Sequence, residues 1–128
     1  MASPLPVKLG VKPGARLHVA AAPAGFELAP LPEGVRSLTR ASGPLDVALV
    51  FVTRRVDLVR RFARLLPALD RAGGLWVAWP KQASRIATDL SFAVVQSIGL
   101  DAGLVDNKSC AIDEDWQALR FVYRLRDR

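Results

Sequence analysis

Cysteine and histidine are almost absent from this 128-residue sequence, which contains one of each, Cys110 and His18. A single cysteine excludes an internal disulfide, and this pair cannot supply the usual ligand set of a zinc site. No apolar run approaches the roughly 20 residues of a membrane span, and the N-terminus has two prolines and no apolar signal segment. We therefore expect no metal site, no membrane association and a cytoplasmic location.

The few residues that could carry chemistry lack activating neighbours in the sequence. His18 lies in the middle of a predicted strand, where a packed histidine is the expected role. Cys110 has no histidine near it, which favours an inert, buried thiol over a nucleophile. The serines at 84, 91 and 97 lack the context of a nucleophile elbow. We therefore predict no catalytic residue.

Positive charge exceeds negative charge, and the two are segregated. The formal net charge is +6; residues 54–71 carry six arginines against two aspartates, while residues 101–115 carry five acids against Lys108. A basic face can bind nucleic acid through counterion release, or it can be an ordinary solvated surface. No nucleic-acid-binding motif is present to support the first interpretation.

Half of the residues are hydrophobic, and the chain is long enough for one domain. We predict this domain over residues 15–128, after a proline-bearing arm at residues 1–14. The segment 46–52 (DVALVFV) is apolar throughout, as a parallel strand covered on both faces should be. An amphipathic helix is predicted over 53–71 and is expected to end at Gly73-Gly74. The other strands expected in this half are 16–22, 35–40 and 75–79.

The second half predicts a helix and a hairpin. Thr88 is the expected N-cap of the helix, Asp89 lies in its first turn, and Gly103 ends it. Strands 104–112 and 119–125 are joined by a short acidic connection and should pair antiparallel. The fold class expected is therefore α/β: an open, mostly parallel, Rossmann-like sheet with an antiparallel C-terminal hairpin.

The order of these elements resembles the sheet of class I methyltransferases. In those enzymes the first strand ends in an acid and a glycine-rich loop, whose amides approach the cofactor closely. The equivalent stretch here, residues 20–26 (AAAPAGF), has one glycine, no acid and Pro23, which has no backbone donor. The second strand ends in Thr39 and Arg40, without the acid that would hold a ribose. We therefore predict no cofactor and no useful binding of S-adenosylmethionine.

Six motifs carry a second resemblance, which spans residues 9–126. They are LGVKPG (9–14), LPEGV (31–35), LWVAWPK (75–81), TDL (88–90), GLVDNKSCAIDEDW (103–116) and LRFVYRL (119–125). Together they resemble a family of small bacterial proteins that forms a domain of unknown function. The resemblance implies an α/β fold and a bacterial, cytoplasmic setting, and it implies no activity. Gln82 and Ala83 replace a more basic and hydroxylated stretch of that family.

The fold should bring separated polar residues to one edge of the sheet, because the carboxyl ends of parallel strands meet there. Lys81 follows one strand, Arg54 and Arg55 follow another, and Thr88 begins a helix. These four residues are the predicted ligand site, and their charge favours an anion. The alternative is that Lys81 forms a surface ion pair with Asp113 or Asp89. The predicted polar partners of the site are Asp89, Asp113, Asn107 and Lys108.

Two classes of function follow from these residues. The first, which we expect, is a non-catalytic methyltransferase-like module that regulates or binds a protein partner, because no insertion encloses a substrate. The second is a small enzyme or sensor that binds a phosphate-bearing metabolite, an anionic small molecule, at the sheet edge. A further alternative is weak binding of nucleic acid through the arginine-rich helix.

Overall fold

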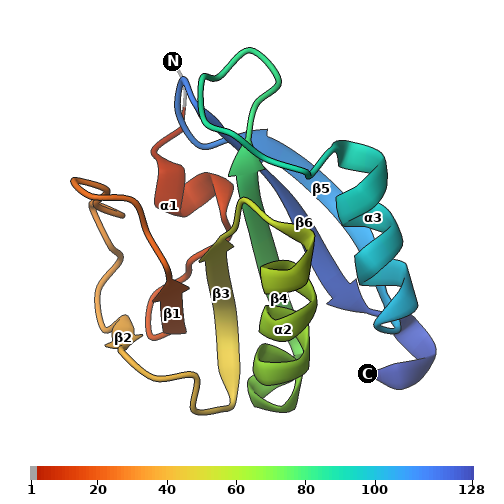
Figure 1. The fold of residues 1–128 in the computed structure, drawn as a ribbon. Coiled ribbons are helices and arrows are strands. Elements are labelled where there is room, and N and C mark those ends of the chain that lie inside the picture. Colours follow the sequence, from red (N-terminus) through yellow and green to blue (C-terminus); the bar gives the residue numbers. More distant parts are fainter. Residues whose placement is uncertain (1–2) are drawn as a thin grey trace.

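Six strands form one sheet in the computed structural model, which describes residues 3–128 (Figure 1). Their order is β2-β1-β3-β4-β6-β5. The first four are parallel, while β6 runs antiparallel to both β4 and β5. The predicted fold class is thus confirmed. The strands are β1 (Arg16–Ala20), β2 (Arg36–Leu38), β3 (Leu45–Phe51), β4 (Leu69–Pro80), β5 (Leu104–Ala111) and β6 (Trp116–Tyr123).

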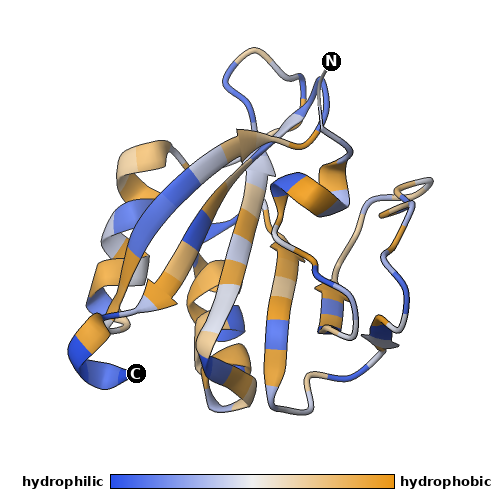
Figure 2. Ribbon diagram, turned by 180° about the vertical axis from the view of Figure 1, so that it is seen from behind, coloured by the Kyte–Doolittle hydropathy of each residue, from blue (hydrophilic) through white to orange (hydrophobic). Residues whose placement is uncertain are grey.

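Helices cover both faces of this sheet. On one face lie α2 (Arg55–Leu65) and α3 (Phe92–Asp101), and on the other lies α1 (Leu5–Lys8), which Figure 2 shows in front of the strands. The apolar strand β3 pairs with β1 and with β4, so it is central, as its composition predicts. It divides two buried clusters: Phe62, Trp79 and Phe121 pack on the α2 side, and Leu9, Trp76 and Trp116 on the α1 side.

The helix predicted over 53–71 is too long. The structure ends α2 at Leu65, adds a 3-10 turn at Leu66–Ala68 that contains Pro67, and begins β4 at Leu69. Gly73 and Gly74 lie inside this strand and do not end the helix. A Cβ at Gly73 would lie 2.7 Å from the Leu45 carbonyl oxygen, and one at Gly74 would overlap the Arg120 guanidinium. The two glycines therefore permit close packing of the strand and of the Arg120 side chain. The prediction that they end the helix is wrong.

The predicted N-cap of α3 is also wrong. Ser91 is the N-cap, and its Oγ accepts the Val94 N–H at 3.3 Å. Thr88 lies in the preceding loop, where its hydroxyl donates to the Thr53 carbonyl at 2.6 Å and accepts the Leu90 N–H at 3.0 Å. The Thr88 hydroxyl thus holds the loop against the end of β3. The residues next to Thr88 in the sequence do not indicate this contact, because its partner lies 35 residues away.

The C-terminal hairpin is confirmed. The C′ role of Gly103 is confirmed too, because Gly103 follows the α3 C-cap, Ala102, and has a φ of 95°. Strand β6 begins earlier than expected, at Trp116, because the hairpin turn is tight. One carboxylate oxygen of Asp113 accepts the N–H of Asp115 at 2.8 Å and that of Trp116 at 3.0 Å. Asp113 is therefore a turn-forming residue in this structure.

The N-terminal segment packs against the sheet from Leu5 onward. Leu9 and Val11 are buried, and the Trp76 indole N–H donates to the Leu9 carbonyl at 2.9 Å. The division at residue 14 into an arm and a domain stays a prediction, but the described part of this arm contributes to the α1-side core. Within residues 3–128, no helix combines the length and apolar character needed to cross a bilayer.

Candidate functional site

The strand order reverses between β1 and β3, because β2 lies on one side of β1 and β3 on the other. In open α/β sheets, ligands bind in the crevice beyond the carboxyl ends of the strands at such a point. Two hollows meet there and share Ala21, Arg61 and Arg64. We call them together the switch-point cleft. The first, about 430 Å³, is also lined by Phe51, Val52, Thr53, Asp57, Arg60 and Trp116. The second, about 530 Å³, is also lined by His18, Val19, Ala20, Thr39, Arg40, Ala41 and Leu65.

Small residues keep the backbone accessible in this cleft. Ala21 follows β1 directly and is the sole described non-glycine residue with positive φ, at 58°. Such a conformation costs free energy in a residue with a Cβ, and it recurs at binding sites. Ala21 and Ala22 are exposed, and neither has a side chain beyond Cβ to fill the cleft. A ligand could therefore approach the main chain at the end of β1.

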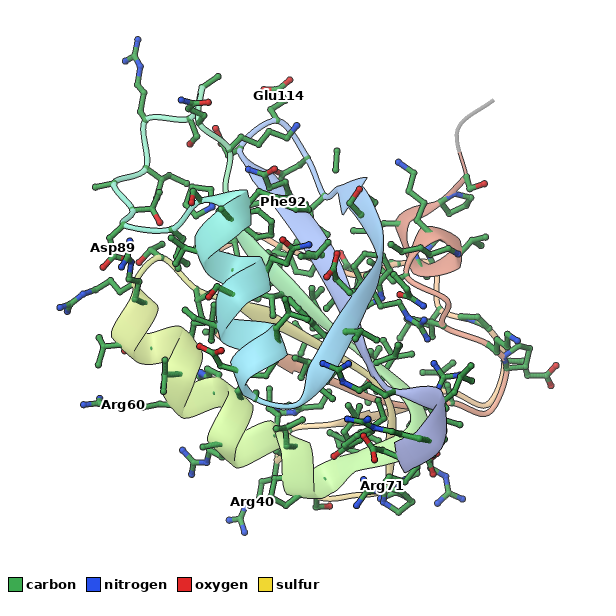
Figure 3. All side chains as sticks on the ribbon, turned by 90° about the vertical axis from the view of Figure 1, so that its right-hand side faces the viewer. Arg40, Arg60, Arg71, Asp89, Phe92 and Glu114 are labelled. Atoms are coloured by element: carbon green, nitrogen blue, oxygen red, sulfur yellow. The ribbon has the colours of Figure 1, made fainter. Side chains whose placement is uncertain are left out.

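The charges of the cleft come mainly from α2. Asp57 is half-buried in the first turn, with Arg60, Arg61 and Arg64 on the following turns. Within residues 3–128, the one ion pair with an N–O distance up to 4.0 Å joins Arg126 and Asp127. The Asp57 carboxylate is thus not engaged by a neighbouring arginine. Figure 3 shows Arg60 and Arg40 projecting away from the ribbon into solvent.

Aromatic rings support the floor of the cleft. Phe51 ends β3, and its ring meets Trp116 edge-on at a centroid distance of 5.1 Å. The Phe51 ring also meets the Phe26 ring, at a centroid distance of 4.8 Å. Edge-to-face pairs of this kind add about 0.5–1.5 kcal/mol beyond the burial of area. They hold the carboxyl end of β3 in a fixed position beside Ala21.

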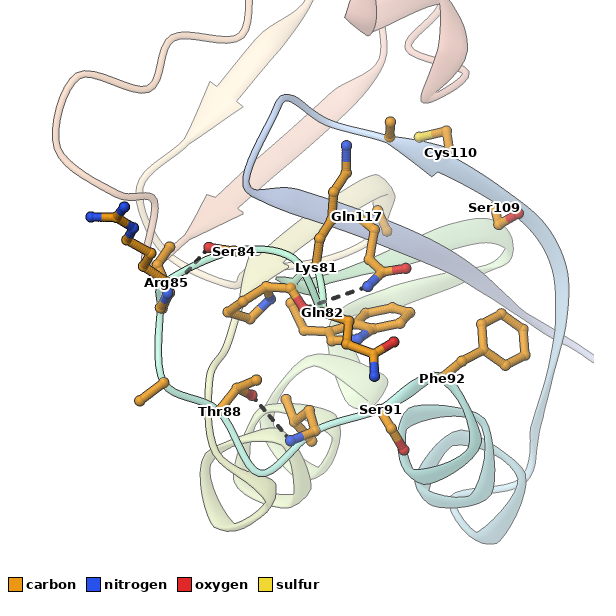
Figure 4. A pocket seen from close by; sticks show the side chains of 17 residues that line it. Lys81, Gln82, Ser84, Arg85, Thr88, Ser91, Phe92, Ser109, Cys110 and Gln117 are labelled. Carbon is orange, nitrogen blue, oxygen red and sulfur yellow. Dashed lines mark hydrogen bonds between the residues drawn. The ribbon is translucent and has the colours of Figure 1, made fainter.

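A second cavity, about 1010 Å³, lies at the carboxyl end of β4 (Figure 4). We call it the β4 cavity. The loop of residues 81–91 borders it on one side, the first turn of α3 on another, and the hairpin of β5 and β6 on the third. Its lining includes Trp79, Lys81, Gln82, Arg85, Phe92, Ser109, Cys110 and Gln117.

The fold brings the predicted site residues together only in part. Lys81 and Thr88 line the β4 cavity, but Arg54 and Arg55 do not. Arg55 instead turns to the loop, where its Nε donates to the Asp89 carbonyl at 3.3 Å. No ion pair of Lys81 with Asp113 or Asp89 occurs in the described part of the chain. The anion site at these residues stays a prediction.

The remaining predicted partners lie apart from that loop. Asn107 accepts a hydrogen bond from the Arg120 guanidinium at 3.4 Å, and Lys108 is exposed on β5. Sequence reasoning missed Asp57, Phe92 and Gln117 as site residues. Asp57 could have been found, because it lies one helical turn after an apolar strand. Phe92 and Gln117 carry no such signal, since the tertiary fold alone brings them to the end of β4.

The two scarce residues are both partly or wholly sheltered. His18 is buried, as predicted, and its Nδ1 lies 2.8 Å from the Leu38 carbonyl oxygen. Cys110 is half-buried on β5. Burial raises the pKa of its thiol, against the opposing effect of Lys8 and Lys108. The neutral thiol is therefore favoured, which is the opposite of what a nucleophile requires.

No family model and no curated protein matches this sequence. The fold, however, is similar to solved methyltransferases. A mitomycin 7-O-methyltransferase, MmcR, has a TM-score of 0.67 at 14% identity; 86% of this chain is covered, and the chain spans about half, 49%, of that enzyme. A SAM-dependent methyltransferase from Aquifex aeolicus gives 0.64 at 11% identity, covering 90% of this chain and 85% of that one. Magnesium protoporphyrin IX methyltransferase from Synechocystis with bound SAM has a TM-score of 0.64 at 14% identity, and the match covers 88% of this chain and 71% of that one.

These neighbours correct two predictions. The expected non-catalytic module is contradicted, because these three similar structures are enzymes named for methyl transfer. The expectation that S-adenosylmethionine is not bound is contradicted too, because one neighbour holds SAM and another SAH. The strand order creates the crevice, and Pro23, which has no backbone donor, is not among the residues that line it.

Proposed function

We propose that this chain is a methyltransferase domain that binds S-adenosylmethionine in the switch-point cleft. The observation that carries the proposal is the strand order, with antiparallel β6 placed between β4 and β5 and the reversal at β1 and β3. The fold built on this order is similar to the methyltransferase neighbours over 86–90% of this chain. The bound cofactor would supply an electrophilic methyl group.

The residues of the cleft fit the polar parts of this cofactor. Its ammonium and ribose hydroxyls need acceptors, which Asp57 and the hydroxyl of Thr53 can provide. Its carboxylate needs a cation, and Arg61 and Arg64 border both hollows. The exposed main chain at Ala21 offers further approach without a side chain in the way. Asp57 therefore serves as the acidic hydrogen-bond acceptor that the ends of the first two strands lack.

The test is a calorimetric titration of the full chain with S-adenosylmethionine and with S-adenosylhomocysteine. We expect saturable binding of both, and we expect Asp57→Asn to weaken it. A charge-assisted hydrogen bond contributes about 1.5–3 kcal/mol, so the loss should be roughly 10- to 150-fold. The variant should stay folded, because an acid in the first turn of a helix contributes only about 0.3–1 kcal/mol.

The matched control is Asp101→Asn, which removes an exposed acid at the end of α3, outside the cleft. Its affinity should equal that of the wild-type chain. The proposal fails if folded protein gives no heat and no thermal shift with millimolar amounts of either compound. It also fails if the two aspartate variants weaken binding equally, since binding would then depend on overall charge alone.

A further inference from the structure

The β4 cavity contains an aromatic ring that the core does not use. Phe92, the first residue of α3, is 47% exposed, although phenylalanine is normally buried. Its ring meets Trp79 at a centroid distance of 6.3 Å and an interplanar angle of 60°. Trp79 is itself only 1% exposed, so it forms the wall behind Phe92. One side of the Phe92 ring is thus supported and part of it stays open to the cavity.

Two side-chain amides face the same space. Gln82 and Gln117 line the cavity together with Trp79 and Phe92, and Figure 4 shows these two glutamines and Phe92 around it. The Gln117 amide nitrogen donates to the Pro80 carbonyl at 3.4 Å, which directs this side chain and leaves its oxygen free to accept. Gln82 is exposed and forms no hydrogen bond in the described part of the chain. Each carboxamide carries both an acceptor and donors.

Charge is placed at the rim of this cavity and not in its middle. No aspartate or glutamate is among the lining residues of this cavity within residues 3–128. Figure 4 shows the ends of Lys81 and Arg85 directed away from Phe92. The interior between Phe92 and the two glutamines is therefore neutral, apolar on one side and rich in amide donors and acceptors on the other. A charged group placed there would lack a partner.

We infer that the β4 cavity binds a planar heterocycle with a cyclic amide edge, the class to which uracil and guanine rings belong. The ring stacks on Phe92, and its adjacent carbonyl and N–H groups pair with the carboxamides of Gln82 and Gln117. Such rings are recognised by aromatic stacking together with hydrogen bonds to their edges. The inference rests on the proposed function in one respect, that this ring belongs to the methyl acceptor.

The test is a titration of ¹⁵N-labelled full chain with uridine, followed through the glutamine side-chain amide signals. The chain has three glutamines. The third, Gln96 on α3, already donates to the Asp106 carboxylate on β5 at 3.2 Å. We expect the signals of Gln82 and Gln117 to shift and that of Gln96 to stay. The control ligand is 3-methyluridine, which has the same ring without the N–H; it should bind roughly 2- to 12-fold more weakly.

Two variants separate stacking from folding. Phe92→Ala should weaken uridine binding roughly 5- to 150-fold, the range for one base stacked on an aromatic ring. Gln82→Ala, at an exposed loop position, should weaken it roughly 2- to 12-fold without loss of stability. The matched control is Val59→Ala, which removes an exposed apolar side chain from α2, away from the cavity. It should bind uridine as the wild-type chain does.

The inference is overturned if uridine causes no shift, if Gln96 shifts as much as the other two, or if 3-methyluridine binds equally well. Unchanged affinity in Phe92→Ala overturns it as well. Calorimetry with S-adenosylmethionine on the same variants distinguishes this failure from failure of the proposed function. We expect Phe92→Ala to retain cofactor affinity, because Phe92 lies outside the switch-point cleft.

Discussion

The carboxylate of Asp89 caps helix α2 from a loop that lies 34 residues downstream: it accepts the backbone N–H of Arg55 at 2.8 Å. Arg54, the N-cap residue, provides no side-chain hydrogen bond of its own. Asp89 is fixed in turn by its own N–H, which donates to the Thr53 carbonyl at 3.3 Å. The start of α2 and the loop that borders the β4 cavity therefore depend on each other, although they are distant in the sequence.

Replacing this distant cap should destabilise the fold modestly. We expect Asp89→Ala to lower the free energy of unfolding by about 0.5–2 kcal/mol, the range for loss of an N-cap acceptor. Asp89→Asn keeps an acceptor oxygen and should lose less. Chemical denaturation measures both. Equal losses in the two variants would mean that charge, and not the hydrogen bond to Arg55, matters at this position.

Two glycines near α3 should resist substitution for different reasons. At Gly99 a Cβ would overlap the Phe121 ring, so Gly99→Ala should cost about 1–3 kcal/mol of stability through overpacking. At Gly103 nothing lies within 4 Å of a Cβ, but φ is 95°, so Gly103→Ala should cost about 1–2 kcal/mol through backbone strain. Adding Phe121→Leu should relieve the first loss and not the second. A double-mutant cycle by denaturation would show this.

The hydrogen bond between Trp76 and the Leu9 carbonyl should make the N-terminal segment part of the cooperative fold. Trp76→Phe retains an aromatic ring but leaves the buried carbonyl without its donor. We expect a loss of about 1–3 kcal/mol in the free energy of unfolding. Hydrogen exchange should also speed up at Val11 in this variant. Exchange at Val11 that stays unchanged would show that the segment is held by packing alone.

Cys110 should react slowly with alkylating reagents at neutral pH. Burial raises the pKa of its thiol, so the thiolate fraction at a given pH is smaller than in an ordinary cysteine. The stabilisation that comes from the neutral thiol is complete below the pKa of Cys110 in the unfolded chain, and it is lost as pH rises through the higher pKa in the folded chain. Iodoacetamide labelling between pH 7 and 10 measures the thiolate fraction. Labelling as fast in the folded chain as in denaturant would contradict it.

The arginines of the switch-point cleft should favour the neutral product over the cationic cofactor. S-adenosylmethionine carries a sulfonium, and Arg60, Arg61 and Arg64 outnumber Asp57 in the cleft. We expect S-adenosylhomocysteine to bind more tightly at low salt, with the difference narrowing at about 0.5 M salt as charges are screened. Calorimetry at two salt concentrations provides the comparison. Tighter binding of the cofactor, insensitive to salt, would contradict this role of the arginines.

Much of the fold could be predicted from local patterns. The continuous apolar run of β3 indicated a central strand, and the acidic connection between two strands indicated the hairpin. The helix boundaries were less predictable. Gly73 and Gly74 resemble a helix stop, but they serve close packing inside β4. Local sequence does not distinguish these uses, because the nearest atoms that the missing Cβ would meet come from β3 and β6.

The candidate sites depended on the tertiary structure much more. The sequence by itself determined which residue types were available: one cysteine, one histidine, an arginine-rich helix and short alanine stretches after the first strand. It did not determine which of them converge. Arg55 hydrogen-bonds to Asp89 through both its backbone N–H and its Nε. Phe92, Gln82 and Gln117 line one cavity although they come from three separate segments of the chain. Convergence of this kind is set by strand order and loop anchoring, which are long-range properties of the chain.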